Sequence, residues 1–171
     1  MDKIYFVGMM GSGKTTTAKE LAKLRGLSDS AIVDLDKLIE EKEQKSINQI
    51  FSERGEDVFR GLETEVLRAV SNNSIHVMIS TGGGAVLSRT NIDLMRRGKI
   101  IYLKTSFNVL WQRVKNSKTR PLIQGDMPEE KFRSIFDERT PVYEKIANYT
   151  VVTDGKTPGE VAKEINEKFF K

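Results

Sequence analysis

Residues 8–15, with the sequence GMMGSGKT, fill every fixed position of the phosphate-binding pattern G-x-x-x-x-G-K-[ST]. An apolar run at residues 4–7 precedes this segment, and a helical pattern follows it over about residues 14–25. Between a strand and a helix, such glycines let backbone N–H groups converge on a polyphosphate, and the helix N-terminus adds partial positive charge. The alternative is a glycine turn that happens to precede a helix, which the Lys-Thr pair and the flanking patterns disfavour. The sequence therefore predicts a nucleoside triphosphate site.

Two side chains of this segment have roles that the pattern itself predicts. Lys14 would place a positive charge beside the β- and γ-phosphates, and the Thr15 hydroxyl can coordinate Mg²⁺. The residues expected to bind the nucleotide are Gly11, Ser12, Gly13, Lys14, Thr15 and Thr16.

The composition predicts one compact domain over residues 1–171, because 38% hydrophobic and 30% charged residues are typical of globular chains. The chain has no cysteine, which excludes disulfides and thiolate metal sites. No apolar run approaches the roughly 18 residues of a membrane span, and the N-terminus has the pattern of a strand and not of a signal segment. We therefore expect a cytoplasmic monomer with no membrane contact.

The net charge of +4 leaves a nucleic-acid partner to be considered. Such a partner would favour Lys and Arg clustered with aromatic residues, whereas here most basic residues are mixed with acids, as in residues 40–45. The exceptions are single arginines near glycine or proline, namely Arg60, Arg120 and Arg139. They predict a small anionic ligand and no nucleic acid.

Short apolar runs alternate with helical patterns along the whole chain, which predicts an α/β fold with a parallel sheet covered on both faces. The expected strands are residues 4–7, 31–33, 75–79, 100–103 and 149–152. The expected helices are residues 14–25, 36–53, 57–71, 88–97, 106–115, 129–147 and 157–169. His76 lies inside the third run, where a core or strand-edge residue is favoured over a catalytic base.

Two strand ends besides the first carry candidate site residues, because ligands of parallel sheets bind at the carboxyl ends of the strands. Asp34 and Asp36 follow the second strand, where they can cap a helix or serve Mg²⁺ and an acceptor hydroxyl. Three glycines at residues 82–84 follow the third strand and permit close approach of a ligand.

Residues 115–127 interrupt the helical pattern with polar residues, Pro121 and Gly125. A plain connection is one interpretation. In a nucleotide enzyme the favoured one is a lid that closes over the phosphates, with Arg120 on it.

Three charged residues on helical patterns are ambiguous when taken alone. Arg60 lies off the apolar stripe of its helix and can reach Glu63, so an ordinary surface ion pair remains possible. Arg139 lies about one turn beyond the apolar residues Phe132, Ile135 and Phe136 of its helix, and taken alone it would also be interpreted as a surface residue.

Five blocks, taken together and in order, resemble the shikimate kinase family over nearly all 171 residues. They are residues 8–15, residues 34–36, Phe59-Arg60 with Glu63, residues 81–84, and residues 120–122 followed by Arg139 and Tyr143. The first block occurs in many kinases and ATPases, whereas the combination is specific.

The resemblance implies ATP-dependent phosphorylation of the 3-hydroxyl of shikimate, in the route to chorismate and aromatic amino acids. It implies a five-stranded parallel sheet of order 2-3-1-4-5. Shikimate would be bound by Asp36, Arg60, Gly82, Gly83, Gly84 and Arg139.

The resemblance also implies roles around the nucleotide. Asp36 would take the hydroxyl proton, Arg120 would stabilise the transferring phosphoryl group, and Thr15 and Asp34 would hold Mg²⁺. Arg113, Lys156 and Pro158 would flank adenine, although the family often has Arg where Lys156 stands.

Two alternative functions remain at the level of the sequence. A gluconate or nucleoside monophosphate kinase shares the phosphate loop and general fold, but two arginines and an aspartate suit a small hydroxylated carboxylate better. A nucleic-acid-stimulated ATPase is disfavoured by the dispersed charge.

Overall fold

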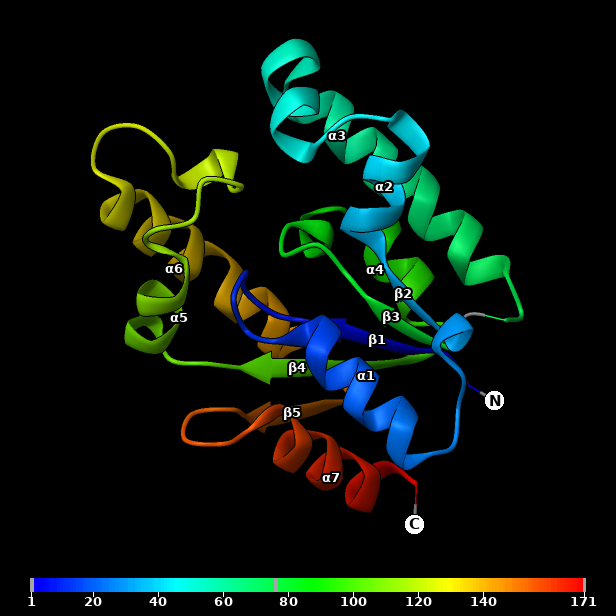
Figure 1. Ribbon diagram of the computed structural model, residues 1–171. Helices are drawn as coiled ribbons and strands as arrows, with labels where there is room; N and C mark the ends of the chain where they lie inside the picture. Colours follow the sequence, from blue (N-terminus) through cyan, green and yellow to red (C-terminus); the bar gives the residue numbers. More distant parts are fainter. Residues whose placement is uncertain (1, 76, 171) are drawn as a thin grey trace.

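The computed structural model describes residues 2–75 and 77–170, so the expectation for His76 lies outside the described residues. Five parallel strands form one sheet in the order β2-β3-β1-β4-β5, as the family resemblance predicted (Figure 1). They are β1 (Ile4–Val7), β2 (Ile32–Asp34), β3 (Met78–Ser80), β4 (Lys99–Lys104) and β5 (Tyr149–Val152). The α/β prediction is confirmed.

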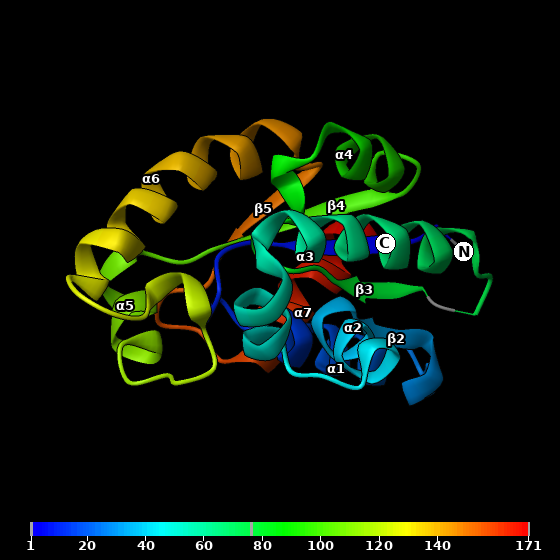
Figure 2. The same ribbon diagram turned by 90° about the horizontal axis from the view of Figure 1, so that it is seen from above.

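Helices cover both faces of this sheet (Figures 1 and 2). On one face lie α1 (Lys14–Leu24) and α7 (Pro158–Phe169). The other carries α3 (Ile47–Asn72), α4 (Arg89–Met95), α5 (Phe107–Val114) and α6 (Pro128–Ile146), with α2 (Leu35–Glu43) packed on α3. Short 3₁₀ turns are η1 (Asp29–Ala31), η2 (Ala85–Leu87) and η3 (Pro121–Ile123).

Two hydrophobic cores follow from the alternation of side chains along the strands. In β1, Ile4 and Phe6 belong to the core under α1 and α7, whereas Tyr5 and Val7 belong to the core under α3–α6. All four side chains are buried, which explains why the strand sequence is an unbroken apolar run. The rigid sheet therefore fixes where each strand end presents its polar residues.

The predicted helix over residues 36–53 is wrong, because the chain breaks it after Glu43. Gln44 adopts a left-handed conformation, and Ser46 caps α3 through a capping box with Gln49. These local hydrogen bonds stop one helix and start the next, although the apolar periodicity continues across the break. The break predicted between residues 53 and 57 is present as a kink within α3 at Gly55, whose φ of 82° favours glycine.

Among the described residues, no helix combines the length and the apolar character needed to cross a membrane.

Candidate active site

The phosphate loop forms one wall of a polar cavity at the carboxyl edge of the sheet. Its lining residues are Met10, Gly11, Gly13, Lys14, Thr15, Thr16, Asp34, Asp36, Ser80, Thr81, Gly83 and Arg120. Lys14 Nζ donates to the carbonyl oxygens of Gly8 and Met9, at 2.9 and 3.0 Å. Burial lowers the pKa of Lys14 to about 8, against the opposing charges of Asp36 and Asp34, and a bound polyphosphate would add negative charge beside this ammonium.

Three oxygen-bearing side chains meet beside the first turn of α1. The Thr15 hydroxyl donates to Asp34 Oδ2 and lies 2.9 Å from the Ser80 hydroxyl oxygen. The strand register explains the meeting, because Asp34 and Ser80 are paired positions of β2 and β3. Ser80 was not predicted as a site residue; its position at the end of β3, beside the phosphate loop, was the available signal.

Asp34 fills the capping role considered for it at the level of the sequence, and its second oxygen is placed for the predicted metal role. Its Oδ1 caps α2 by accepting from the backbone N–H groups of Asp36 and Lys37, at 3.1 and 3.3 Å, while Oδ2 faces Thr15. One carboxylate and two hydroxyl groups are hard oxygen donors, which fit Mg²⁺ with water completing its coordination. Among the described residues, no cluster of three His, Cys, Asp or Glu side chains offers a competing metal site.

Asp36 occupies the first turn of α2, and its buried Oδ1 atom has no hydrogen-bond partner among residues 2–75 and 77–170. A Cβ built on Gly82 would lie 2.9 Å from this oxygen, so a side chain at residue 82 would force the carboxylate to shift. Burial raises the pKa of Asp36, and the charge of Asp34 raises it further, against the opposing effect of Lys14, Arg120 and Arg60. A raised pKa makes the carboxylate a better proton acceptor.

A second cavity adjoins the phosphate cavity on the side of α3. It is lined by Met10, Asp36, Ile47, Phe51, Phe59, Arg60, Glu63, Gly82, Gly83, Gly84, Thr119, Arg120, Pro121, Leu122 and Arg139. The two cavities share Met10, Asp36, Gly83 and Arg120. A ligand in the second cavity would therefore meet the end of a polyphosphate between an aspartate and an arginine.

Arg60 is not an ordinary surface ion pair. Its Nη1 donates to Oε2 of Glu63 at 3.0 Å, and Glu63 is fully buried, with burial raising the pKa of its carboxyl. The guanidinium lies on the backbone of Gly84, where an added Cβ would come within 2.4 Å of its Cζ. This close approach requires a residue without a side chain at position 84, and the guanidinium lines the second cavity.

Arg139 is also not a surface residue, because it is only 3% exposed. Within the part of the chain that the structure describes, it forms no ion pair, and its Nε atom has no acceptor. One turn further along α6, the Tyr143 hydroxyl donates to the carbonyl of Gly83 and ties the helix to the glycine turn. A buried guanidinium without a carboxylate partner is suited to an anionic ligand.

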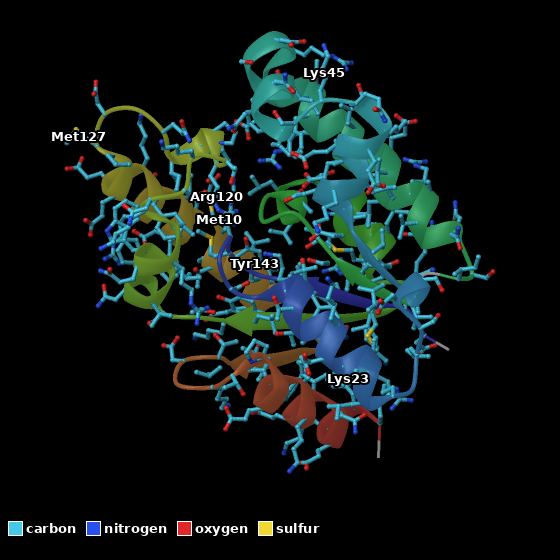
Figure 3. All side chains as sticks on the ribbon, in the orientation of Figure 1. Met10, Lys23, Lys45, Arg120, Met127 and Tyr143 are labelled. Carbon is cyan, nitrogen blue, oxygen red and sulfur yellow. The ribbon has the colours of Figure 1, made fainter. Side chains whose placement is uncertain are left out.

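Residues 115–127 lie against the start of α3 (Figure 2). Four of them line the second cavity, namely Thr119, Arg120, Pro121 and Leu122, and Arg120 also lines the phosphate cavity. Asn48 Nδ2 donates to the backbone oxygen of Lys118 at 2.8 Å, and Ile123 is buried. Figure 3 labels Arg120 next to Met10, and both residues line the second cavity together with Arg139 of α6. That this segment acts as a lid over the phosphates stays a prediction.

Of the three residues expected near adenine, only Arg113 contacts the phosphate loop. Arg113 Nη1 donates to the carbonyl oxygen of Gly11 at 2.9 Å and so reaches the phosphate loop. Lys156 instead forms an ion pair with Glu164 at 2.7 Å, and Pro158 is an exposed residue at the start of α7. Neither of these two lines the phosphate cavity, and their contact with adenine stays a prediction.

The fold and the site together define a class of protein. A phosphate loop at the carboxyl edge of a parallel sheet, joined to a second cavity for an anionic acceptor, is the arrangement of a phosphate-loop kinase.

Comparisons with known proteins identify the family within that class. A family model described as shikimate kinase matches residues 10–169. The shikimate kinase of a Sulfurihydrogenibium species is 41% identical over 169 residues and is covered to 98%, as is this chain. The chain belongs to the shikimate kinase family.

Solved structures agree with the sequence relatives. The shikimate kinase of Acinetobacter baumannii, solved in complex with shikimate, has a TM-score of 0.91 at 37% identity, with 98% of this chain and 92% of that one covered. The enzyme from Aquifex aeolicus gives 0.81 at 36% identity, with 95% and 93% covered.

Proposed function

We propose that this protein transfers the γ-phosphoryl group of ATP to the 3-hydroxyl of shikimate, giving shikimate 3-phosphate in the route to chorismate and the aromatic amino acids. The observation that carries the proposal is the junction of the two cavities at Asp36 and Arg120. Family membership supports the reaction, and the relative solved with shikimate supports the substrate.

Shikimate is a small ring with one carboxylate and three hydroxyl groups, and the second cavity offers groups for both. Arg60 and Arg139 would bind the carboxylate, because a guanidinium presents paired N–H donors that match a planar anion. Asp36 would accept hydrogen bonds from the ring hydroxyls, and the backbone of residues 82–84 would bound the ring on one side. Phe51 and Phe59 supply an apolar wall for the ring carbons.

The chemistry requires one proton transfer and one phosphoryl transfer. The 3-hydroxyl gives its proton to a carboxylate oxygen of Asp36, and its oxygen bonds to the γ-phosphorus as the bond to the β-γ bridging oxygen breaks. The electron pair of that bond leaves with ADP. Lys14 and Arg120 offset the charge that builds on the phosphoryl oxygens, which is the main contribution available to a protein in this reaction.

Mg²⁺ would be held by Thr15 and Asp34, with Ser80 beside them. The bound ion would supply positive charge to the β- and γ-phosphate oxygens. We further propose that the adenine lies beside Arg113, with Lys156 and Pro158 at the margin of its site, and that a monomer is sufficient for activity.

The proposal is tested by measuring ADP formation with shikimate, gluconate and nucleoside monophosphates under identical conditions. We expect rapid turnover with shikimate and background rates with the others. Equal or faster turnover with gluconate or a nucleotide would overturn the assignment of the substrate. Stimulation of ATP hydrolysis by DNA or RNA, without turnover of shikimate, would indicate an ATPase instead.

A further inference from the structure

Glu56 lies outside the predicted site, yet it holds the arginine that would bind the carboxylate of the substrate. Its Oε1 accepts hydrogen bonds from both Nε and Nη2 of Arg60, at 3.2 and 3.0 Å. The third nitrogen, Nη1, donates to Glu63 at 3.0 Å. The guanidinium is thus held by two carboxylates of the same helix and rests on Gly84 with its face.

We infer that Glu56 is a positioning residue that fixes Arg60 for the carboxylate of shikimate, an inference that rests on the proposed function. A guanidinium has five N–H groups, of which these contacts use three. One N–H group on each terminal nitrogen remains for a ligand. Two terminal N–H groups of one guanidinium are the donors that a carboxylate accepts in a bidentate pair.

The backbone places Glu56 for this contact. Gly55 interrupts the helical geometry of α3, so Glu56 begins the second helical segment. A glutamate at the start of a helix with an arginine four residues later is the favourable order for such a pair, because the carboxylate also faces the positive end of the helix dipole. The kink at Gly55 therefore places Glu56 at the start of a helical segment, from which its carboxylate reaches Arg60.

An exposed i,i+4 ion pair contributes little to the stability of a protein, and the side chain of Glu56 is 46% exposed. Arg60 differs, because it is 21% exposed, lines the cavity and lies between Glu56, Glu63 and Gly84. Without Glu56, only Nη1 is held, and the long side chain regains freedom that substrate binding must remove again. The benefit of Glu56 is therefore expected in substrate affinity and not in stability.

The decisive measurement is the steady-state kinetics of Glu56→Ala, with KM for shikimate separated from kcat. We expect KM for shikimate to rise about 3- to 10-fold, with kcat and KM for ATP within about twofold, because one ordered side chain is at stake. Glu56→Gln keeps an acceptor oxygen for Arg60 and should recover most of the affinity. A melting temperature within about 2 °C of the wild type for both variants would show that the fold is intact.

Glu65→Ala is the matched control. Glu65 lies on the same helix in an exposed ion pair with Lys42, at 2.6 Å, and does not line the cavity. It should leave KM for shikimate unchanged. In an Arg60→Lys background, Glu56→Ala should add no further loss, because the group that Glu56 holds is gone.

Three results would overturn the inference. A lower KM for shikimate in Glu56→Ala would mean that Glu56 competes with the substrate for Arg60. An unchanged KM would mean that Glu63 and Gly84 suffice, and equal losses in both the wild-type and Arg60→Lys backgrounds would mean that Glu56 acts elsewhere. Absence of turnover of shikimate by the wild-type protein would instead reject the proposed function, and with it this inference.

Discussion

Oε2 of the buried Glu63 accepts a hydrogen bond from Arg60 Nη1 at 3.0 Å, while its Oε1 has no partner among the described residues. The free oxygen lies against Gly82, on the same side as the unpartnered Oδ1 of Asp36. A buried carboxylate with one unpaired oxygen destabilises a fold, so its presence beside the acceptor cavity indicates a role in binding.

Glu63→Gln should raise KM for shikimate without lowering the stability of the protein. The amide can still accept from Arg60, but it loses the charge that holds the guanidinium. Because burial raises the pKa of Glu63 above the ordinary 4.5, the folded protein keeps a proton that the unfolded chain loses as pH rises. This carboxyl therefore makes folding less favourable as pH rises above about 4.5, and glutamine does not.

Urea unfolding at pH 5 and pH 7 checks that sign, since the stability of the variant relative to the wild type should increase with pH. KM for ATP serves as the internal control. A change in KM for ATP, with KM for shikimate unaffected, would show that Glu63 does not orient Arg60.

The site residues that could be predicted from the sequence are those that lie close together along the chain. Residues 8–15 and Asp34 lie within short segments whose spacing alone fixes their geometry, and their strands were recognisable as apolar runs. The break after Glu43 was missed because apolar periodicity does not report a capping box.

The burial of Arg139 and Glu63 could not be predicted from their own helices. Each is a charged residue on a helix whose apolar residues already account for the face that packs on the core. The helix pattern alone therefore predicted a position on the surface for both. Burial arises across the fold, from glycines at residues 82–84 that leave room for these side chains. Only the resemblance to a family joined those distant residues before the structure did.

The pKa of Lys14 makes the affinity for ATP depend on pH. Burial lowers the pKa to about 8, so the free enzyme loses this charge as pH rises through about 8, and kcat/KM for ATP should fall there.

Lys14→Ala should abolish transfer at every pH, with a melting temperature equal to or above that of the wild type, because burying the charge is unfavourable. Full activity of the variant with a normal melting curve would remove Lys14 from the site.

Asp36→Asn keeps the size of the side chain but removes its charge and its ability to accept a proton. We expect turnover of shikimate to fall by about 10²-fold or more, as for loss of a general base, with a smaller change in KM for ATP. In the wild type, kcat/KM for shikimate should fall as pH drops through the raised pKa of Asp36, because a protonated carboxyl accepts no proton. A defect confined to ATP binding would place Asp36 with the metal ion instead.

Arg120 stands on residues 115–127 and lines both cavities, so it can contact the phosphoryl group during transfer. If residues 115–127 act as the predicted lid, Arg120 reaches the phosphates only when that segment closes, and it should then stabilise the transition state more than the bound ground state. Arginines that neutralise phosphoryl charge in related reactions contribute roughly 10³–10⁵ in turnover. For Arg120→Ala we expect a loss of at least about 10²-fold in kcat, since Lys14 still offsets part of the charge.

Lysine at position 120 should restore activity only in part, because it lacks the planar pair of donors. Lys118→Ala is the matched control, since its exposed side chain lines neither cavity while its backbone oxygen keeps the hydrogen bond from Asn48. Shikimate with a non-hydrolysable ATP analogue should also protect residues 115–127 from proteolysis. Cleavage at the same rate with and without the ligands would show that this segment is no lid, and turnover of Arg120→Ala within a few fold of the wild type would show that its guanidinium does not act on the phosphoryl group.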